Sequence, residues 1–360
     1  MSDYTDKEKI IYIYPQLSSF IRKDIQLLAE KYWVISPSHN WTNKKMTVFS
    51  FLLQFFYLLK EMPGSNSVFV MFGGYWSFIP SILGKIFRKP VFIILGGTDC
   101  VSIPEINYGS LRKTLLRFFI RFSYKLSTRL LPVSEALVET DYTYFPECKY
   151  PKQGYHYFFP DMETPYTVVY NGFEKAKWKN VNILKKRNTF ITVANIFNRI
   201  RYKLKGIDLI LKLANAHKDC HFTIIGMNRE FLESIGQMPG NISSHEFVPS
   251  HQLPTYLNES EFYLQLSISE GFPNALCEGM LCGCIPIGSN VGAIPDIIGN
   301  TGIVVNKRDF KLIDEAVNTF ISMDISERDK LAKETAKRID DNFGIAKRKE
   351  TFFNIIERGS

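Results

Sequence analysis

Residues 267–299 read S-I-S-E-G-F-P-N-A-L-C-E-G-M-L-C-G-C-I-P-I-G-S-N-V-G-A-I-P-D-I-I-G. The apolar run that precedes them, E-F-Y-L-Q-L at 261–266, predicts a buried strand. Pro273 suits the first turn of a helix, so a helix is expected to begin near Asn274. The stretch therefore predicts a strand, a glycine-containing loop and a helix, as in a parallel α/β sheet.

Two glutamates, Glu270 and Glu278, flank the start of this helix with seven residues between them. Backbone N–H groups of Gly271, Phe272 and Asn274 would point out of the helix start, where a phosphate group is well held. Carboxylates beside such an anion site would bind hydroxyl groups. The combination predicts a sugar nucleotide, with the diphosphate at the helix start and the ribose and sugar hydroxyls on the two acids.

The blocks E-G-F-P-N-A-L, E-G-M-L-C-G and G-S-N-V-G-A-I-P-D closely resemble the E-x7-E signature of the retaining glycosyltransferases of family 4. Two glutamates at this spacing could arise by chance in any parallel-sheet protein, but the small residues fall where a nucleotide-cradling backbone has no room for side chains. The resemblance covers most of 180–300. It implies the α/β fold called GT-B, in which two Rossmann-like doubly wound domains face a cleft and a C-terminal helix crosses back to the N-terminal domain.

The length of 360 residues also favours two domains. Short apolar runs alternate with helical patterns in both halves, which predicts parallel sheets. We expect an N-terminal acceptor-binding domain at 1–175, a linker at 174–182 and a nucleotide-sugar-binding domain at 183–341, with a final helix at 342–360 returning to the first domain. The expected strands are 10–14, 33–36, 68–72, 91–95, 130–133 and 167–173, then 189–194, 221–226, 245–248, 262–266 and 284–288.

The run K-G-I-D at 205–208 follows the strand I-T-V-A-N and aims Lys205 at the ligand-binding edge of the sheet. In the family, a lysine followed by glycine here and an arginine some residues earlier grip the nucleotide diphosphate. The resemblance assigns this role to Lys205 and, among the arginines of an insertion-like loop, to Arg199 rather than Arg201. A solvated basic loop is the alternative for each. The implied donor-binding set is Glu278, Lys205, Arg199, Gly271, Phe272, Asn274 and Ala275.

The expected catalytic residues are Glu270, Lys205 and Asp99. No D-x-D motif stands at a strand end, so we expect no metal and no cofactor, and the leaving diphosphate must be neutralised by Lys205, an arginine and the helix start. By resemblance Glu270 holds the hydroxyls of the donor sugar and Glu278 the ribose. Retention is then expected from a same-face mechanism in which the departing phosphate accepts the proton of the incoming hydroxyl. UDP or GDP is the expected donor nucleotide.

Asp99 ends the segment G-G-T-D after the strand 91–95, where family members frequently carry a histidine that faces the reaction centre. It could hydrogen-bond a donor hydroxyl or an acceptor, or it could stabilise the turn after the glycines. Both roles are kept as alternatives.

The net charge of +8 lies mainly in the first half, where residues 1–180 carry 22 Lys and Arg against 15 Asp and Glu. A helix expected at 111–129 places Lys113, Arg117, Arg121, Lys125 and Arg129 in one basic stripe, which is typical of helices on anionic membranes and also of an ordinary exposed helix face. The pattern favours a lipid-linked or membrane-associated acceptor over a small soluble one. Nucleic acid is not expected as a partner, because no recognised binding motif accompanies the charge.

A second apolar segment, 47–59, is too short to span a bilayer and is expected to form a buried helix. The six cysteines form no C-x-x-C pair and the chain starts with polar residues, so a reduced cytoplasmic enzyme, at most peripheral at the inner face of the plasma membrane, is expected.

The leading hypothesis is a retaining glycosyltransferase that moves a sugar from a nucleoside diphosphate sugar to a glycan or lipid-linked acceptor in cell-surface polysaccharide or glycolipid synthesis. Two alternatives are a non-catalytic GT-B scaffold that serves a partner and a GT-B sugar-nucleotide epimerase. A nicotinamide-dependent dehydrogenase is disfavoured because no G-x-G-x-x-G follows the first strand.

Overall fold

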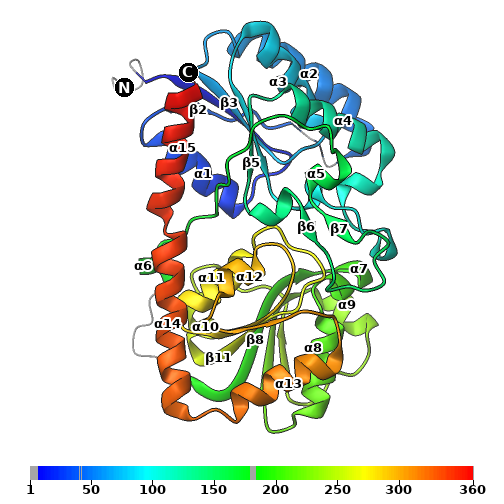
Figure 1. Ribbon diagram of the computed structural model, residues 1–360, viewed down its shortest axis with the longest axis vertical. Coiled ribbons are helices and arrows are strands. Elements are labelled where there is room, and N and C mark those ends of the chain that lie inside the picture. Colours follow the sequence, from blue (N-terminus) through cyan, green and yellow to red (C-terminus); the bar gives the residue numbers. More distant parts are fainter. Residues whose placement is uncertain (1–6, 40, 42, 179–183, 360) are drawn as a thin grey trace.

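Two parallel sheets, each with helices on both faces, stack one above the other along the long axis of the molecule (Figure 1). The computed structural model describes residues 7–39, 41, 43–178 and 184–359. The first sheet has the strand order β2-β1-β3-β4-β5 and the second the order β10-β9-β8-β11-β12-β13. Neighbouring strands within both sheets are parallel, as the alternation of strands and helices predicted.

The strands of the first sheet are apolar and largely buried, because helices cover both of its faces. Its strands are β1 (Lys9–Ile13), β2 (Trp33–Ile35), β3 (Ser67–Met71), β4 (Val91–Leu95) and β5 (Arg129–Pro132). The helices of this domain are α1 (Ser19–Ala29), α2 (Thr47–Glu61), α3 (Tyr75–Phe87), α4 (Thr114–Leu126) and α5 (Tyr155–Phe158). Two short antiparallel strands, β6 (Thr140–Asp141) and β7 (Lys152–Gln153), lie on the side of this domain that faces the second domain. Short 3-10 turns lie at 44–46, 98–100, 104–106, 110–112 and 135–137.

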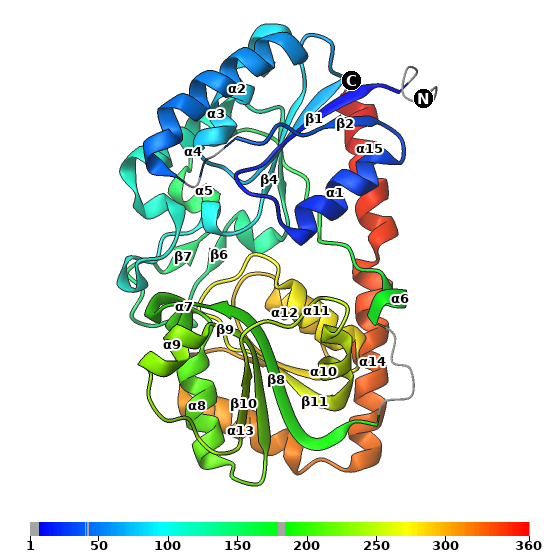
Figure 2. The same ribbon diagram turned by 180° about the vertical axis from the view of Figure 1, so that it is seen from behind.

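The helices divide between the two faces of the first sheet as right-handed crossovers require. Helices α2, α3 and α4 lie side by side on one face, while α1 and α15 (Ile345–Gly359) lie on the other (Figures 1 and 2). The ring of Phe352 on α15 packs against Phe69 of β3 with centroids 5.4 Å apart. The last helix of the chain is therefore part of the core of the first domain.

The second sheet contains β8 (Lys186–Ile196), β9 (His221–Met227), β10 (Ile242–His245), β11 (Ser260–Gln265), β12 (Ile285–Ser289) and β13 (Ile303–Val305). Its helices are α7 (Arg199–Leu204), α8 (Ile207–Ala216), α9 (Arg229–Ser234), α10 (Leu253–Glu259), α11 (Asn274–Leu281), α12 (Ile294–Ile298), α13 (Phe310–Ile321) and α14 (Ile325–Phe343). Helix α11 begins at Asn274 after Pro273, as predicted. Strand β10 begins and ends three residues earlier than predicted, and β13 was not predicted.

The chain passes between the domains twice, and the two passages touch. Helix α14 ends at Phe343, and the extended residue Gly344, with a ψ of 143°, separates it from α15. The N–H of Phe173 donates to the carbonyl oxygen of Phe343, and the N–H of Ile345 donates to that of Phe173, each at 2.9 Å. The first passage then forms the short helix α6 (Lys175–Trp178), whose Trp178 is buried, whereas the rest of the expected linker, 179–182, lies outside the described residues.

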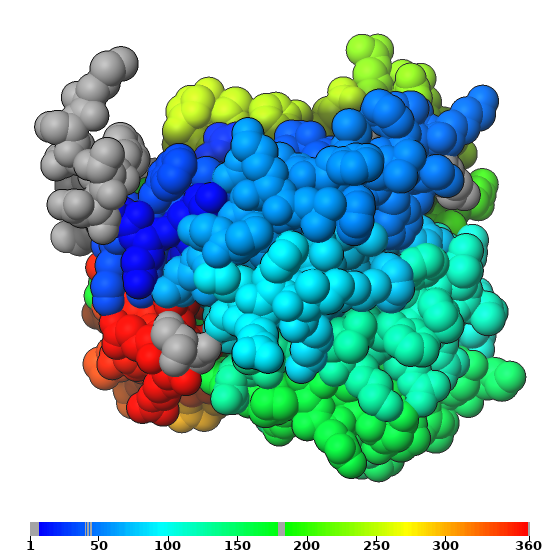
Figure 3. All heavy atoms as spheres, turned by 90° about the horizontal axis from the view of Figure 1, so that it is seen from above, coloured from blue at the N-terminus to red at the C-terminus, as the bar shows by residue number. Residues whose placement is uncertain are grey.

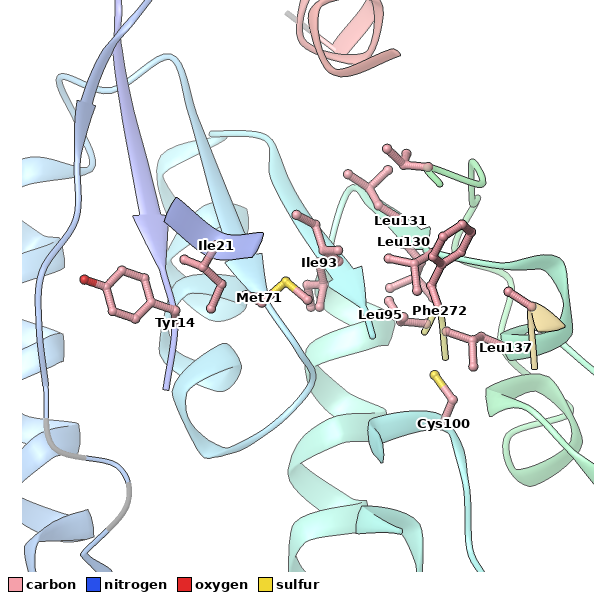
Figure 4. Packing of buried hydrophobic residues seen from close by; sticks show 14 of the residues in the cluster. Tyr14, Ile21, Met71, Ile93, Leu95, Cys100, Leu130, Leu131, Leu137 and Phe272 are labelled. Atoms are coloured by element: carbon pink, nitrogen blue, oxygen red, sulfur yellow. The ribbon is translucent and has the colours of Figure 1, made fainter. Parts of the chain in front are cut away.

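One hydrophobic cluster continues across the junction of the domains. Figure 4 shows Phe272 of the second domain beside Leu130 and Leu95 of the first. The Phe272 ring also contacts Phe343 at 5.3 Å between centroids. The loop that precedes α11 is therefore anchored in the core of the other domain.

Two further expected elements differ from the structure. The segment 167–173 is not a sheet strand, although Thr167 and Val169 donate backbone hydrogen bonds to β5. The expected helix at 111–129 is shorter, since α4 covers Thr114–Leu126 and Arg129 belongs to β5. The basic stripe is thus not continuous on one helix.

The expectation of a buried helix at 47–59 is wrong. Helix α2 forms there, but only Ser50, Gln54 and Leu58 are buried, and most of its large apolar side chains are exposed. Among the described residues, no helix combines the length and apolar character needed to cross a bilayer.

Candidate functional site

The loop between β11 and α11 is held from three sides. The hydroxyl of Ser289, at the end of β12, donates to the carbonyl oxygen of Ser267 at 2.7 Å. The N–H of Ile268 donates to the carbonyl oxygen of Leu204 at 2.7 Å, and the hydroxyl of Tyr142 from the first domain donates to the carbonyl oxygen of Ile268 at 2.6 Å. These bonds fix the backbone that carries the first glutamate of the pair.

Lys205 and Glu270 meet at the carboxyl end of β11. The Lys205 ammonium donates to Oε1 of Glu270, and the two side chains are 18% and 12% exposed, so they are shielded without being sealed from solvent. Nε2 of Gln265 donates to the same carboxylate oxygen at 3.0 Å. Such a charge-assisted pair is stronger than a neutral hydrogen bond. An entering diphosphate would compete for the ammonium and leave the carboxylate to accept from hydroxyl groups.

Gly206 explains how the lysine comes so close to the strand end. Its φ is +70°, and a Cβ at this position would lie 2.3 Å from the carbonyl oxygen of Leu266. Only glycine fits such a left-handed turn against another backbone. The pair Lys205–Gly206 therefore places an ammonium at the ligand-binding edge of the sheet, where α7 ends and α8 begins.

Glu278 lies within α11, partly buried, near helix α1 of the first domain. Burial raises the pKa of its carboxyl group from 4.5 to about 7, and the positive charge of Lys23 on α1 opposes this shift. The ammonium of Lys23 lies 5.6 Å from the ring centroid of Phe173. A carboxyl group with a pKa near neutrality can accept a hydrogen bond from a ribose hydroxyl once it is ionised.

The first domain contacts the loop between β11 and α11, which carries Glu270, through glycines. A Cβ on Gly271 would lie 2.0 Å from the carbonyl oxygen of Gly96, and one on Gly97 would lie 2.9 Å from the Cα of Gly271. The carbonyl oxygen of Gly271 accepts from the N–H of Ala293 at 3.1 Å, which fixes it within its own domain. The two backbones touch directly here, because neither has a side chain between them.

Both oxygens of Asp99 are used inside the first domain. Oδ2 accepts from the hydroxyl of Tyr124 and the N–H of Gly73, each at 2.8 Å, and Oδ1 accepts from the N–H groups of Gly97 at 3.0 Å and Gly96 at 3.2 Å. Asp99 is 1% exposed, and burial raises the pKa of its carboxyl group. The carboxylate stabilises the glycine turn, which is one of the two alternatives given above, and a catalytic role for Asp99 stays a prediction.

Arg199 begins α7 and is exposed, so a helical turn stands where an insertion-like loop was expected. The Arg201 guanidinium lies over the ring of Phe197 at 5.8 Å. Among the contacts of the described residues, none joins Arg199 to Lys205 or Glu270. A role for Arg199 at the diphosphate stays a prediction.

The start of α11 contributes its main chain more than its side chains. Phe272 is 7% exposed and stacks on Phe173 with centroids 6.2 Å apart, so only its backbone could contact a ligand. Oδ1 of Asn274 accepts from Nδ2 of Asn171 at 2.9 Å. Ala275 lies in the first turn. The helix start thus combines the backbone N–H groups of its first turn with an amide pair that spans the two domains.

Sequence reasoning missed Lys23, Gln265 and Tyr142. Gln265 had a visible signal, because a polar residue at the end of the apolar strand E-F-Y-L-Q-L is placed at the ligand edge of a parallel sheet. Lys23 and Tyr142 had none, since their roles depend on how the two domains meet.

The sequence similarity to known proteins lies mainly in the second domain. Residues 174–338 match the family model of the glycosyl transferases group 1. A segment of the chain is 28% identical over 109 residues to the phosphatidylinositol N-acetylglucosaminyltransferase GPI3 subunit of Saccharomyces cerevisiae. This match covers 27% of the chain and spans only 23% of the length of that relative.

Solved structures resemble the whole chain. Sucrose-phosphate synthase from Thermosynechococcus elongatus superposes with a TM-score of 0.75 at 12% identity, over 98% of this chain and 99% of that one. HepE from Anabaena, solved in complex with UDP, superposes with a TM-score of 0.73 at 12% identity, over 97% of this chain and 100% of that one. The expected GT-B fold is therefore confirmed. The chain therefore has the GT-B fold, and its residues 174–338 match the model of the glycosyl transferases group 1.

Proposed function

We propose that this protein is a retaining glycosyltransferase of the family-4 type, which moves a sugar from a nucleoside diphosphate sugar to a hydroxyl of a glycan or lipid-linked acceptor. The single observation that carries the proposal is the contact of Lys205 with Glu270 at the end of β11, next to the start of α11. An ammonium, a carboxylate and a helix start within one partly buried site match the diphosphate and hydroxyls of such a donor. The match of residues 174–338 to the glycosyl transferases group 1 supports it.

In the proposed reaction Lys205 binds the diphosphate and stabilises the negative charge that develops on it as the glycosidic bond breaks. Glu270, released from Lys205, accepts hydrogen bonds from the sugar hydroxyls, and Glu278 accepts from the ribose. The acceptor oxygen bonds to the anomeric carbon on the face from which the diphosphate leaves, and its proton passes to the departing phosphate oxygen. No metal takes part in this scheme, because the cation at the diphosphate is the lysine.

UDP is the first donor nucleotide to test, because the structural neighbour HepE was solved in complex with UDP and with UDP-glucose. We place the acceptor on the first domain and propose that it is a cell-surface glycan or glycolipid precursor, processed at the cytoplasmic side of a membrane. The relative that carries the phosphatidylinositol name supports a lipid acceptor.

Calorimetry with UDP, GDP, ADP, CMP and dTDP tests the donor site. Saturable binding of one nucleotide is expected, and Lys205→Ala should abolish or greatly weaken it. Lys212→Ala, an exposed lysine on α8, is the matched control and should bind as the wild type does. Binding of none of the five nucleotides, or unchanged binding by Lys205→Ala, would overturn the site assignment.

A non-catalytic scaffold is the second candidate, and one observation favours it: Asp99 is buried in the first domain at the position where family members carry a histidine. Turnover with UDP-sugars separates the two. Release of UDP that depends on Lys205 supports a transferase, whereas nucleotide binding without any release supports the scaffold. Conversion of the donor sugar in the absence of an acceptor would instead indicate an epimerase.

A further inference from the structure

Helix α2 has its polar side turned inward and its apolar side turned outward. Its buried residues are Ser50, Gln54 and Leu58, at helical spacing, and Nε2 of Gln54 donates to the carbonyl oxygen of Trp76 at 3.0 Å. The outward side chains are large and apolar, with Phe56 66% exposed. A surface helix of a soluble domain has the opposite arrangement. This helix therefore presents a face that is built for an apolar environment.

Helix α4 extends the same apolar surface. The ring of Phe51 on α2 contacts Phe119 on α4 at 5.7 Å between centroids, and Phe119 contacts Phe118 at 5.7 Å. Figure 3 shows the region of α2, in blue, at the surface of the first domain beside the following helices. We call this surface the α2–α4 face; its exposed apolar residues are Val48, Phe49, Leu52, Leu53, Phe56 and Leu59 on α2 and Leu115, Phe118 and Phe122 on α4. Apolar patches of this kind on a protein surface mark interaction sites.

The charges around the α2–α4 face are almost all positive. The segments 45–61, 75–89 and 112–126, which include α2, α3 and α4, contain ten lysines and arginines and one acid. That acid, Glu61, is already paired with Lys9 at 2.9 Å. Lys45, Lys60 and Lys125 are exposed on these segments. Two of the arginines are engaged within the domain, since Arg121 pairs with Asp161 and Arg117 donates to the carbonyl oxygen of Phe158.

We propose that the α2–α4 face binds the surface of an anionic phospholipid bilayer, with its aromatic and aliphatic side chains at the level of the acyl chains and its lysines at the headgroups. Apolar insertion and a basic rim together are the two signals that reversible membrane binding requires. A second copy of the chain fits this face less well, because a symmetric contact would bring two basic rims together. The proposal does not rest on glycosyl transfer, since it concerns the surface of the first domain and not the site around Lys205 and Glu270.

The position of the face gives such binding a use. A cavity of about 490 Å³ opens beside the first turn of α4 and is lined by Ser102, Asn107, Arg112, Thr114 and Arg117, among others. Thr114 and Arg117 sit next to Leu115 and Phe118 of the α2–α4 face. The lining of this cavity includes Ser102, which follows the 3-10 turn at 98–100 that contains Asp99. Membrane binding would thus bring the polar part of a lipid close to the 3-10 turn at 104–106, which contacts α7 of the second domain.

Vesicle flotation with the full chain tests the proposal. Wild-type protein should float with phosphatidylcholine–phosphatidylglycerol vesicles and less with pure phosphatidylcholine vesicles, and added salt should weaken the binding. The double variant Phe49→Ser/Phe56→Ser should lower the partition coefficient at least about tenfold, because two exposed aromatic rings that would insert into the bilayer are lost. Phe247→Ser is the matched control, since Phe247 is 78% exposed on the second domain, and it should float as the wild type does.

Two further measurements keep the test decisive. The thermal unfolding midpoint of Phe49→Ser/Phe56→Ser, followed by circular dichroism, should stay close to that of the wild type, which shows that the variant is folded. Lys45→Glu/Lys125→Glu should lose the preference for anionic vesicles. The proposal is overturned if the wild type does not float, if the double serine variant floats equally well, or if the wild type is a dimer in solution that the double serine variant converts to monomer.

Discussion

Arg348 of α15 and Asp24 of α1 form a bidentate ion pair inside the first domain, although 324 residues separate them in sequence. Nε and Nη2 of the arginine each lie 2.7 Å from a carboxylate oxygen, and the two side chains are 3% and 2% exposed. The hydroxyl of Tyr12 donates to the same carboxylate at 3.0 Å, and Nη1 of Arg348 donates to the carbonyl oxygens of Val169 and Tyr170. The last helix is therefore tied to the first helix of the chain and to the first passage between the domains.

Removal of the arginine should unfold the first domain more easily. We expect Arg348→Ala to lower the free energy of unfolding by about 3–5 kcal/mol, because it leaves a buried carboxylate without its partner. Denaturant titration followed by circular dichroism measures this loss. Lys349→Ala, which breaks the exposed pair with Glu30, should cost less than about 1 kcal/mol. Equal losses in the two variants would contradict the assignment of a buried pair.

The glycine contact between the domains should control turnover and not donor binding. Gly271→Ala places a methyl group where the carbonyl oxygen of Gly96 stands, so the domains cannot approach as closely. A displacement of about 1 Å can cost about a hundredfold in rate, and we expect kcat to fall by about that factor while the nucleotide Kd changes little. Steady-state kinetics and calorimetry measure the two quantities. Gly240→Ala is the control, because a Cβ there meets open space, and its kcat should equal that of the wild type.

Glu278 should make stability depend on pH in an unusual direction. Its pKa is about 7 in the folded protein and about 4.5 when unfolded, so between these values the folded state holds a proton that the unfolded state has lost. The free energy of unfolding should therefore fall as pH rises from about 4.5 to about 7, by roughly 3 kcal/mol from this group. Glu278→Gln cannot lose the proton, so relative to the wild type it should gain stability over this range.

Urea titrations of both proteins at several pH values measure that difference. Glu315→Gln, at an exposed position, is the matched control. A constant difference between Glu278→Gln and the wild type from pH 5 to pH 8 would show that the carboxyl group is not perturbed by burial. Nucleotide affinity should rise over the same range in the wild type alone, since the ionised carboxylate is the better acceptor for the ribose hydroxyls.

Asp99 should behave as a structural residue. Asp99→Asn replaces one acceptor oxygen by an NH2 group, which can accept a hydrogen bond from neither Tyr124 nor Gly73, so the free energy of unfolding should fall by about 1–3 kcal/mol. The nucleotide Kd should stay within about twofold of the wild-type value, since the domain that binds the donor is intact. Tyr124→Phe is the companion variant, and it should lower stability by a smaller amount. A change of nucleotide affinity without a loss of stability would indicate that Asp99 acts at the donor site and not only in the turn.

The sequence predicted the elements whose signals are local. Pro273 before an amphipathic run was sufficient to place the start of α11, and the lysine–glycine pair at 205–206 was sufficient to place an ammonium at the sheet edge. The direction in which α2 faces was not predictable, because its apolar residues outnumber what a single buried side could hold and only the packing of α3 selects the polar side as the inner one. Asp99 was ambiguous because its partners Gly73 and Tyr124 come from two other segments.

The pair of passages between the domains also limits how the protein can move. Phe173 and Gly344 lie side by side in a backbone bridge, so both connections leave the first domain at the same place. Two domains connected along a single edge can rotate apart about that edge, but they cannot easily slide past each other. Opening and closing of the two domains should then follow one rotation about this edge, with the least travel at Gly344 and greater travel on the opposite side of the molecule, where β6, β7 and α7 lie (Figure 1).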